Sequence, residues 1–171
     1  MNSVHYSSKK DDWETPQELF DYLDGLYQFE LDVCASEYNA KCDHFFTKEK
    51  SCLDCENWSN KVFGHNGIFM NPPYGREIGK FVKKAYEQSD KCLGPIVCLL
   101  PARTDTNWFH DYCKFADEIF FLRGRLKFSG CRNSAPFPSM VVVFRNALER
   151  KNQNNQAFYD LPKIYQRGNR L

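Results

Sequence analysis

The chain has 171 residues, a formal net charge of +1 and a hydrophobic content of 42%. This length fits one domain, and this hydrophobic content is enough to bury a core, which excludes a wholly disordered chain. The sequence has no apolar run long enough for a transmembrane helix and no N-terminal signal segment, so we expect a cytoplasmic protein without a membrane partner. Its eight cysteines are then expected to be reduced thiols rather than a disulfide framework.

The first predicted element is a helix that follows residues 1–12, a largely polar segment that we expect to be flexible. Thr15 and Pro16 are of the types preferred at the N-cap and at the first position of a helix, and Glu18 completes a capping box with Thr15. Apolar residues then recur at helical spacing, which predicts one buried face and a helix end near Gly25. The predicted buried face consists of Leu19, Tyr22, Leu23 and Leu26.

Short apolar runs alternate with helical patterns along the rest of the chain. They predict strands over residues 29–34, 45–46, 68–70, 95–100, 118–122 and 139–144, and helices over residues 77–90 and 106–116. This order indicates an α/β fold with a mostly parallel twisted sheet and helices on both faces. The last two strands have no helix between them, so we expect an antiparallel last strand. We predict a single domain over residues 13–146 and a polar, basic C-terminal tail over residues 147–171.

The near-zero net charge conceals two regions of opposite sign. Residues 11–60 hold thirteen acidic and three basic residues, a net charge of −10, whereas residues 61–171 hold eighteen basic and nine acidic residues, a net charge of +9. A basic face is suited to phosphate contact, although an unevenly charged solvated surface would give the same totals.

Several common cofactor motifs are absent from the sequence. It has no G-x-G-x-x-G fingerprint, no P-loop, no G-x-S-x-G elbow and no H-E-x-x-H pair. These absences lower the support for nicotinamide, flavin and nucleoside-triphosphate chemistry.

The most specific chemical signal is Asn71-Pro72-Pro73-Tyr74, directly after the predicted strand over residues 68–70. In open α/β sheets, ligands bind just beyond the carboxyl ends of strands. There the Asn71 amide oxygen and the Pro72 carbonyl can accept both protons of one amino group, and the Tyr74 ring offers a face on which a planar base can stack. The alternative is a simple Asn-Pro turn with a buried tyrosine.

N-P-P-Y resembles the catalytic motif of amino-group methyltransferases that use S-adenosylmethionine. Taken alone it leaves the acceptor open, because protein-glutamine methyltransferases share it. Over about residues 12–144, however, the chain resembles the phage-type DNA adenine-N6 methyltransferase family. The matching stretches are Asp12 to Pro16, Leu31 to Ser36, His44 to Thr47, Trp58, Asn71 to Tyr74, Leu99 to Thr106, Arg123 to Phe128 and Ser134 to Ser139.

The resemblance implies a Rossmann-like methyltransferase fold and transfer of a methyl group from S-adenosyl-L-methionine to the exocyclic N6 amino group of adenine in DNA. It further implies that the adenine flips out of the duplex into a pocket formed by N-P-P-Y. The alternatives are methylation of RNA or of a protein glutamine, and a catalytically inactive nucleic-acid-binding module. A phage or prophage origin would place the protein in the cytoplasm of a bacterial host, and we expect a monomer or a homodimer.

The resemblance also implies a cofactor site built from three parts of the chain. Residues before the first helix lie near the amino-acid end of the cofactor, and the end of the first strand replaces the usual glycine-rich loop, with Asp32 facing the methionine ammonium group. Phe46 packs on the cofactor's adenine ring, whose edge is bounded by Leu53 or Asp54. The assigned residues are Trp13, Thr15, Pro16, Asp32, Cys34, Ala35, Ser36, Phe46, Leu53 and Asp54.

A cluster of basic residues is the predicted contact with DNA. Arg123, Arg125, Lys127 and Arg132 have no acidic residue among them, and Phe128 and Phe137 interleave with them, as on nucleic-acid surfaces. A solvated hairpin is the alternative. Arg103 follows another strand end, where it contacts a phosphate or forms a structural pair with Asp105.

Two further sites are open to other chemistry. Cys42, His44, Cys52 and Cys55 include one C-x-x-C pair, but their overall spacing is not that of a standard zinc site, and we expect no metal. Cys34 lies at a strand end where a nucleophile can act, provided that His44 or His110 approaches it.

Overall fold

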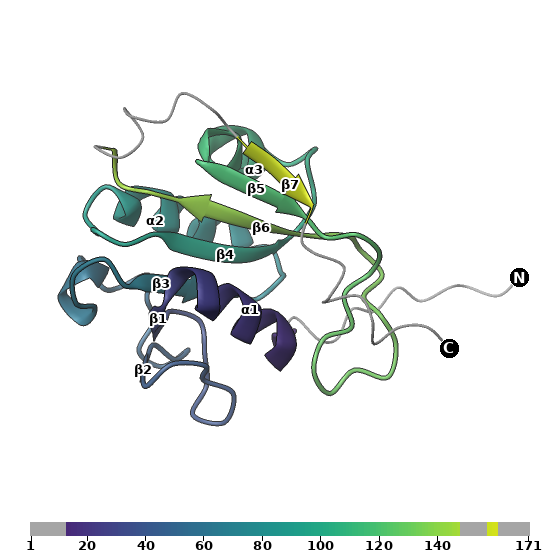
Figure 1. Ribbon diagram of the computed structural model, residues 1–171, viewed down its shortest axis with the longest axis horizontal. Helices are drawn as coiled ribbons and strands as arrows, with labels where there is room; N and C mark the ends of the chain where they lie inside the picture. Colours follow the sequence, from purple (N-terminus) through teal and green to yellow (C-terminus); the bar gives the residue numbers. More distant parts are fainter. Residues whose placement is uncertain (1–12, 148–156, 161–171) are drawn as a thin grey trace, which may run out of the picture.

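The computed structural model describes residues 13–147 and 157–160, which form one central sheet flanked by helices (Figure 1). The sheet has seven strands in the order β2-β1-β3-β4-β6-β5-β7. Their bounds are β1 (Phe29–Asp32), β2 (His44–Phe45), β3 (Gly67–Met70), β4 (Ile96–Pro101), β5 (Glu118–Phe121), β6 (Ser139–Phe144) and β7 (Ala157–Asp160).

The strand directions confirm the predicted fold class. β1 pairs in parallel with β2 and β3, and β3 pairs in parallel with β4. β6 is antiparallel to both of its neighbours, β4 and β5, as expected for a strand that follows its predecessor without a helix between them. β7 pairs in parallel with β5.

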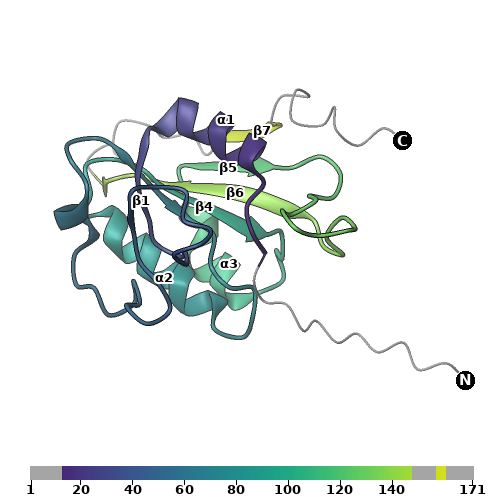
Figure 2. The same cartoon turned by 90° about the horizontal axis from the view of Figure 1, so that it is seen from below.

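Helices cover both faces of the sheet, which makes three layers (Figure 2). α1 (Gln17–Tyr27) lies on one face, and α2 (Ile78–Ser89) and α3 (Asn107–Asp111) lie on the other. None of the helices in residues 13–147 is long and apolar enough to cross a membrane.

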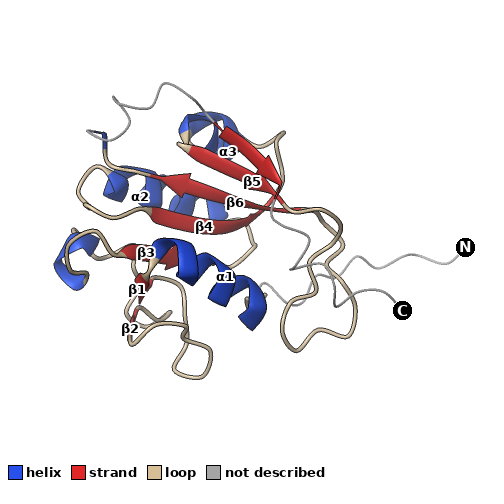
Figure 3. Ribbon diagram, in the orientation of Figure 1, coloured by secondary structure: helices blue, strands red, loops and turns tan. Residues whose placement is uncertain are grey.

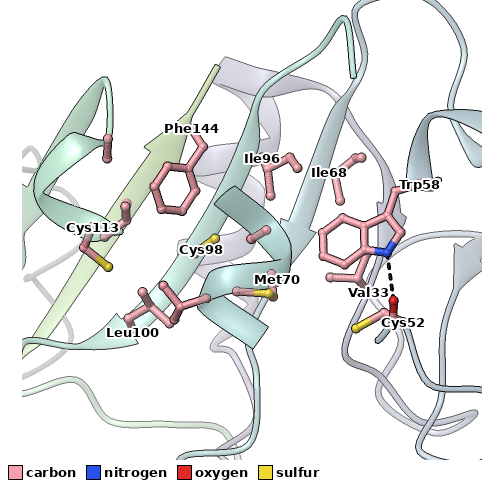
Figure 4. Packing of buried hydrophobic residues seen from close by; sticks show 14 of the residues in the cluster. Val33, Cys52, Trp58, Ile68, Met70, Ile96, Cys98, Leu100, Cys113 and Phe144 are labelled. Carbon is pink, nitrogen blue, oxygen red and sulfur yellow. Dashed lines mark hydrogen bonds between the residues drawn. The ribbon is translucent and has the colours of Figure 1, made fainter. Parts of the chain in front are cut away.

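The side chains of the central strands alternate between two cores. On the α2 face, Met70, Cys98 and Val142 pack with α2 and α3, and Figure 4 shows part of this core, including Met70 and Cys98. On the α1 face, Phe69 and Val141 pack with α1. Every residue of β4 and β6 is buried, and all of them except Ser139 are apolar, which is the pattern of strands covered on both faces.

The segment between β2 and β3 is anchored to α2 through Trp58, in the short turn η1 (Trp58–Lys61). The Trp58 indole donates to the Cys52 carbonyl at 3.0 Å (Figure 4), and the Trp58 backbone N–H donates to the Gln88 amide oxygen at 2.9 Å. Gln88 in turn donates to the Glu56 carbonyl at 2.9 Å, so both ends of this buried amide are satisfied.

The beginning of α1 differs from the sequence prediction. Pro16, not Thr15, is the N-cap residue, and no side chain caps the helix. The predicted capping box is therefore wrong, because the Thr15 hydroxyl accepts a hydrogen bond from Asn71 instead. Within α1, Phe20 is buried, whereas Leu26 is 54% exposed and does not belong to the core.

Two other regions also depart from the predicted elements. The helix expected over residues 106–116 is interrupted: α3 ends at Asp111, and η2 (Cys113–Phe115) follows as a 3-10 turn. β7 lies within the segment predicted as a polar tail. The predictions for residues 1–12, and for residues 148–156 and 161–171 of that tail, fall outside the described residues.

Loops gather where the parallel strands end (Figure 3). β1, β3, β4 and β5 have their carboxyl ends on one edge of the sheet, where the antiparallel β6 begins. This carboxyl edge carries residues 33–36, the N-P-P-Y motif, residues 102–106 and a long loop over residues 122–138, which extends beyond the strands in Figure 1. A doubly wound sheet binds its ligands at this edge.

Candidate active site at the carboxyl edge of the sheet

Asn71 directly follows β3, and its carboxamide has one satisfied end and one unsatisfied end. The side-chain nitrogen donates to the Trp13 carbonyl at 2.5 Å and to the Thr15 hydroxyl oxygen at 2.9 Å. The side-chain oxygen is buried and has no hydrogen-bond partner among the described residues. Since unpaired buried acceptors are rare and costly, this oxygen is a candidate for binding a donor from a ligand.

The rest of the N-P-P-Y motif is packed against the sheet. Pro72 is buried and Pro73 is partly buried. The Tyr74 hydroxyl donates to the Leu99 carbonyl of β4 at 3.0 Å, and burial raises the pKa of Tyr74 well above its ordinary value. The tyrosine therefore stays protonated, which leaves it a packing and hydrogen-bonding role rather than that of an acid or base.

Four aromatic rings form a cluster beside the motif, namely Trp13, Tyr74, Phe128 and Phe137. The Trp13 centroid lies 5.2 Å from the centroids of Phe128 and Phe137. Tyr74 meets the same two rings edge to face, at 5.9 and 5.5 Å. These are ordinary separations and angles for favourable aromatic pairs. The cluster joins the residues before α1 to the N-P-P-Y turn and to the loop over residues 122–138.

The burial of Phe128 corrects one expectation. Only 1% of its surface is exposed, so it does not interleave with the arginines on a nucleic-acid surface. Its ring belongs to the α1-face core, where it packs against Trp13 and Tyr74. Phe137 is partly exposed and packs against Trp13 and Tyr74.

Residues 13–16 form what we call the N-terminal strap, because an ion pair and hydrogen bonds tie this segment to two others. Lys41 lies 3.6 Å from the Glu14 carboxylate and also donates at 3.0 Å to the side chain of Gln17, the residue that follows the strap. In the loop over residues 122–138, Ser129 donates its backbone N–H to the Glu14 carbonyl at 2.9 Å and its hydroxyl to the Thr15 carbonyl at 3.2 Å. Sequence reasoning missed Ser129 and Lys41, since nothing in the chain order pairs either with the strap.

The predicted cofactor residues of the strap have definite places. Thr15 is buried, with 3% of its surface exposed, and its hydroxyl points to Asn71. Trp13 and Pro16 are partly buried. Their roles toward a cofactor stay predictions. The hydrogen bond between Thr15 and Asn71 was not predicted from the sequence.

Asp32 is the last residue of β1, and its carboxylate binds both ends of the loop that follows. Its two carboxylate oxygens accept backbone N–H groups, from Cys34 at 3.1 Å and from Lys41 at 3.2 Å. Burial raises the pKa of Asp32 to about 6, against the lowering effects of these two hydrogen bonds and of the Lys41 charge. A buried carboxylate of this kind would be stabilised by an adjacent cation.

The predicted cofactor residues after β1 lie together with Phe46. The Ala35 backbone N–H donates to the Phe46 carbonyl at 3.0 Å, and the Phe46 N–H donates to the Asp32 carbonyl at 2.9 Å. Cys34, Ala35, Ser36 and Phe46 are all partly buried.

Leu53 and Asp54, the two residues predicted to bound the edge of the cofactor's adenine ring, differ in exposure. Leu53 packs against the α2-face core together with Cys34 and Phe46. Asp54 is exposed, so it lies outside that core.

The predicted DNA contacts are all exposed on the carboxyl edge. The loop over residues 122–138, here called the basic loop, carries Arg123, Arg125, Lys127 and Arg132 and no acidic residue. Its own shape is fixed by a hydrogen bond from the Ala135 N–H to the Leu126 carbonyl at 2.8 Å.

The basic loop also turns at two glycines. Gly124 and Gly130 have φ angles of 78° and 70°, which L residues with side chains rarely adopt. Arg103 is exposed beyond β4, and within residues 13–147 no ion pair joins it to Asp105.

The rival chemical sites receive no support from the geometry. Among the described residues, no three His, Cys, Asp or Glu side chains are grouped so that they could hold a metal ion. Burial and the neighbouring Cys52 thiol raise the pKa of Cys34 well above its ordinary value, which keeps this thiol neutral and poorly nucleophilic.

Comparison with known proteins places the chain in a family. The family of "DNA N-6-adenine-methyltransferase (Dam)" proteins matches residues 2–169. A DNA N-6-adenine-methyltransferase of Escherichia phage T1 is 39% identical over 118 residues, which are 68% of this chain and 47% of that protein. One from Haemophilus phage HP1 is 34% identical over 145 residues, 80% of each chain. This chain thus spans about half the length of the phage T1 relative and most of the HP1 relative. Because the family model covers residues 2–169 and the HP1 relative is matched over 80% of each chain, the chain belongs to the DNA N-6-adenine-methyltransferase (Dam) family.

Proposed function

We propose that this protein transfers a methyl group from S-adenosyl-L-methionine to the N6 amino group of adenine in DNA. The observation that carries the proposal is the unpartnered, buried oxygen of Asn71 at the carboxyl edge of the sheet. It is an acceptor held beside the Pro72 backbone, and an amino group is the donor that two such acceptors suit. Membership of the adenine methyltransferase family supports adenine as the base that carries this amino group.

The residues after β1 fit the proposed cofactor. The buried Asp32 carboxylate favours a cationic group beside it, and the small side chains of Cys34, Ala35 and Ser36 allow a ligand to approach the backbone. When bound, S-adenosyl-L-methionine supplies an electrophilic methyl group on its sulfonium sulfur. Phe46, joined to this loop by backbone hydrogen bonds, would hold the adenine ring of the cofactor.

Asn71 would act on the nucleophile. The lone pair of adenine N6 is delocalised into the ring, so the nitrogen is a weak nucleophile until its geometry changes. Hydrogen bonds from its two protons to Asn71 and to the Pro72 carbonyl favour a more tetrahedral nitrogen and stabilise the positive charge that develops on it. No ionised side chain is needed, in accord with the raised pKa values of Cys34 and Tyr74.

Reaching N6 requires that the adenine leave the base stack. The exposed Arg103 and the basic loop lie on the same edge as Asn71 and would bind the phosphates on either side of the flipped nucleotide. Phe137 and Tyr74 offer aromatic surface next to the Asn71 turn, against which the base can stack.

The test is to incubate the full chain with radiolabelled S-adenosyl-L-methionine and plasmid DNA that lacks adenine methylation, and then to sequence the methylated positions. Asn71→Ala should lower the rate by about a hundredfold or more, since an aligned polar group in an active site contributes on this scale. Its affinity for the cofactor, measured by calorimetry, should stay within about twofold.

Asn60→Ala is the control, because Asn60 is exposed in η1, and it should behave as wild type. Transfer of the label to RNA or to a glutamine peptide instead of DNA would reject the proposed acceptor. Equal losses of turnover and of cofactor binding in Asn71→Ala would reject the role given to this side chain.

A further inference from the structure

The carboxamide of Asn71 is fixed in one of its two orientations by the N-terminal strap. Its nitrogen carries two protons, and both are accepted, one by the Trp13 carbonyl and one by the Thr15 hydroxyl. Turning the carboxamide over would place its oxygen against the Trp13 carbonyl oxygen, which has no proton to donate. The strap therefore determines that the oxygen of Asn71, and not its nitrogen, is left for a ligand.

The strap is in turn held by the basic loop. Ser129 donates both its backbone N–H and its hydroxyl to carbonyls of the strap, at 2.9 and 3.2 Å. The Trp13 ring packs against Phe128 and Phe137, which belong to the same loop. Continuous contacts thus run from the loop that carries the exposed arginines, through the strap, to the side chain of Asn71.

We propose that Thr15 and Ser129 are positioning residues that hold the Asn71 oxygen toward the amino group to be methylated. Thr15 acts directly, as an acceptor for the Asn71 nitrogen, and Ser129 acts by fixing the carbonyl of Thr15. Through Ser129, the loop that would bind DNA is linked to the group that would bind the flipped base. The inference rests on the proposed function, because it assigns these residues to that reaction.

The first test replaces Thr15. Thr15→Val keeps the shape of the side chain and removes the acceptor, whereas Thr15→Ser keeps the hydroxyl. At saturating DNA and cofactor, the single-turnover rate should fall about fivefold to tenfold in Thr15→Val and stay within about twofold in Thr15→Ser, since one hydrogen bond is lost only in the former. A Thr15→Val variant that weakens cofactor binding without lowering this rate would make Thr15 a cofactor contact and overturn the proposal.

The second test replaces Ser129. Ser129→Ala should lower the same rate by about twofold to fivefold, less than Thr15→Val, because the backbone hydrogen bond of Ser129 to the strap remains. The control is Ser59→Ala, which removes a serine hydroxyl that donates to Asn57 at 2.7 Å in a different part of the chain. Equal rates for Ser129→Ala and Ser59→Ala would overturn the role of Ser129.

A third variant tests the selection of orientation. Asn71→Asp keeps an oxygen for the target amino group but puts a second oxygen where the nitrogen faces the Trp13 carbonyl. We expect a rate at least about tenfold below wild type, because a carboxylate has no proton to donate to the Trp13 carbonyl. Wild-type activity in Asn71→Asp would show that the strap does not select the amide and would overturn the proposal.

Nuclear magnetic resonance gives a readout that does not depend on turnover. The two side-chain amide protons of Asn71 can be assigned by their absence from the spectrum of Asn71→Ala. In Thr15→Val, one of them should shift and exchange faster with solvent, and Thr15→Ser should restore it. A wild-type chain that transfers no methyl group to DNA overturns the proposed function and this inference together. An active wild type whose Thr15→Val variant keeps both its rate and its Asn71 amide signals overturns the inference alone.

Discussion

The buried carboxylate of Asp32 makes the stability of the fold depend on pH in a direction opposite to that of most carboxylates. Burial raises its pKa from the ordinary value of 3.8 to about 6. The folded chain then binds this proton more tightly than the unfolded chain does. The resulting stabilisation is fully present below about pH 3.8 and is lost as the pH rises through about 6.

The size of the effect follows from the two pKa values. A shift of about two units corresponds to at most about 3 kcal/mol, reached only at pH values below both. Between about pH 5 and about pH 7, the contribution of Asp32 to the free energy of unfolding falls by about 1 kcal/mol. With only 3% of its surface exposed, Asp32 is little screened by solvent.

The assay is urea denaturation of wild type and Asp32→Asn at a series of pH values without cofactor. The asparagine cannot ionise, and it loses one acceptor for a backbone N–H, which adds an offset that does not depend on pH. The free energy of unfolding of the variant, relative to wild type, should rise by about 1 kcal/mol from about pH 5 to about pH 7. The exposed Asp105→Asn variant is the control and should show no such trend. A difference between Asp32→Asn and wild type that is constant with pH would refute the reasoning.

Three further substitutions test the DNA surface, a close packing contact and the tyrosine of the motif. Arg125→Ala should weaken DNA binding and lower the slope of log Kd against log salt by about 0.9, whereas Lys83→Ala, on exposed α2 surface, should leave the slope unchanged. Gly94→Ala should lower the free energy of unfolding, measured by urea denaturation, by about 1–3 kcal/mol, because the new Cβ would lie 2.0 Å from a backbone carbonyl oxygen. Its control is Gly25→Ala in α1, where the new Cβ meets open space, and this variant should be neutral or stabilising in the same assay. Tyr74→Phe removes one hydrogen bond and keeps the ring, so it should cost about 1 kcal/mol in stability while most of the methyl transfer remains, and a complete loss of transfer would assign the hydroxyl a chemical role.

Much of the fold could be predicted because its signals are local. β4 and β6 are apolar runs apart from Ser139, since both of their faces are covered, and α2 has a regular helical pattern with one buried face. The position of Asn71 at the carboxyl edge also follows from the sequence alone. A turn that begins directly after a parallel strand must lie at that strand's carboxyl end.

The departures occur where a tertiary contact competes with a local preference. Thr15 has the residue type and spacing of a helix cap, yet its hydroxyl accepts a hydrogen bond from Asn71, 56 residues away in the sequence. The aromatic ring of Phe128 stands between basic residues in the sequence, yet it turns inward to pack against Trp13 and Tyr74. The residues of β7 gave no clear strand signal, and pairing with β5 decides their conformation.

The sequence by itself thus determined the order of the main strands and helices as far as β6, the family and the place of the N-P-P-Y turn, because periodicity and motif are properties of neighbouring residues. Only the tertiary structure decided how the turn is held. Ser129 meets the strap across 114 residues of sequence, and the strap then fixes the Asn71 carboxamide. Such contacts depend on how the sheet brings distant parts of the chain together. The sequence around a hydrogen-bond donor in a loop does not show which distant acceptor it will bind.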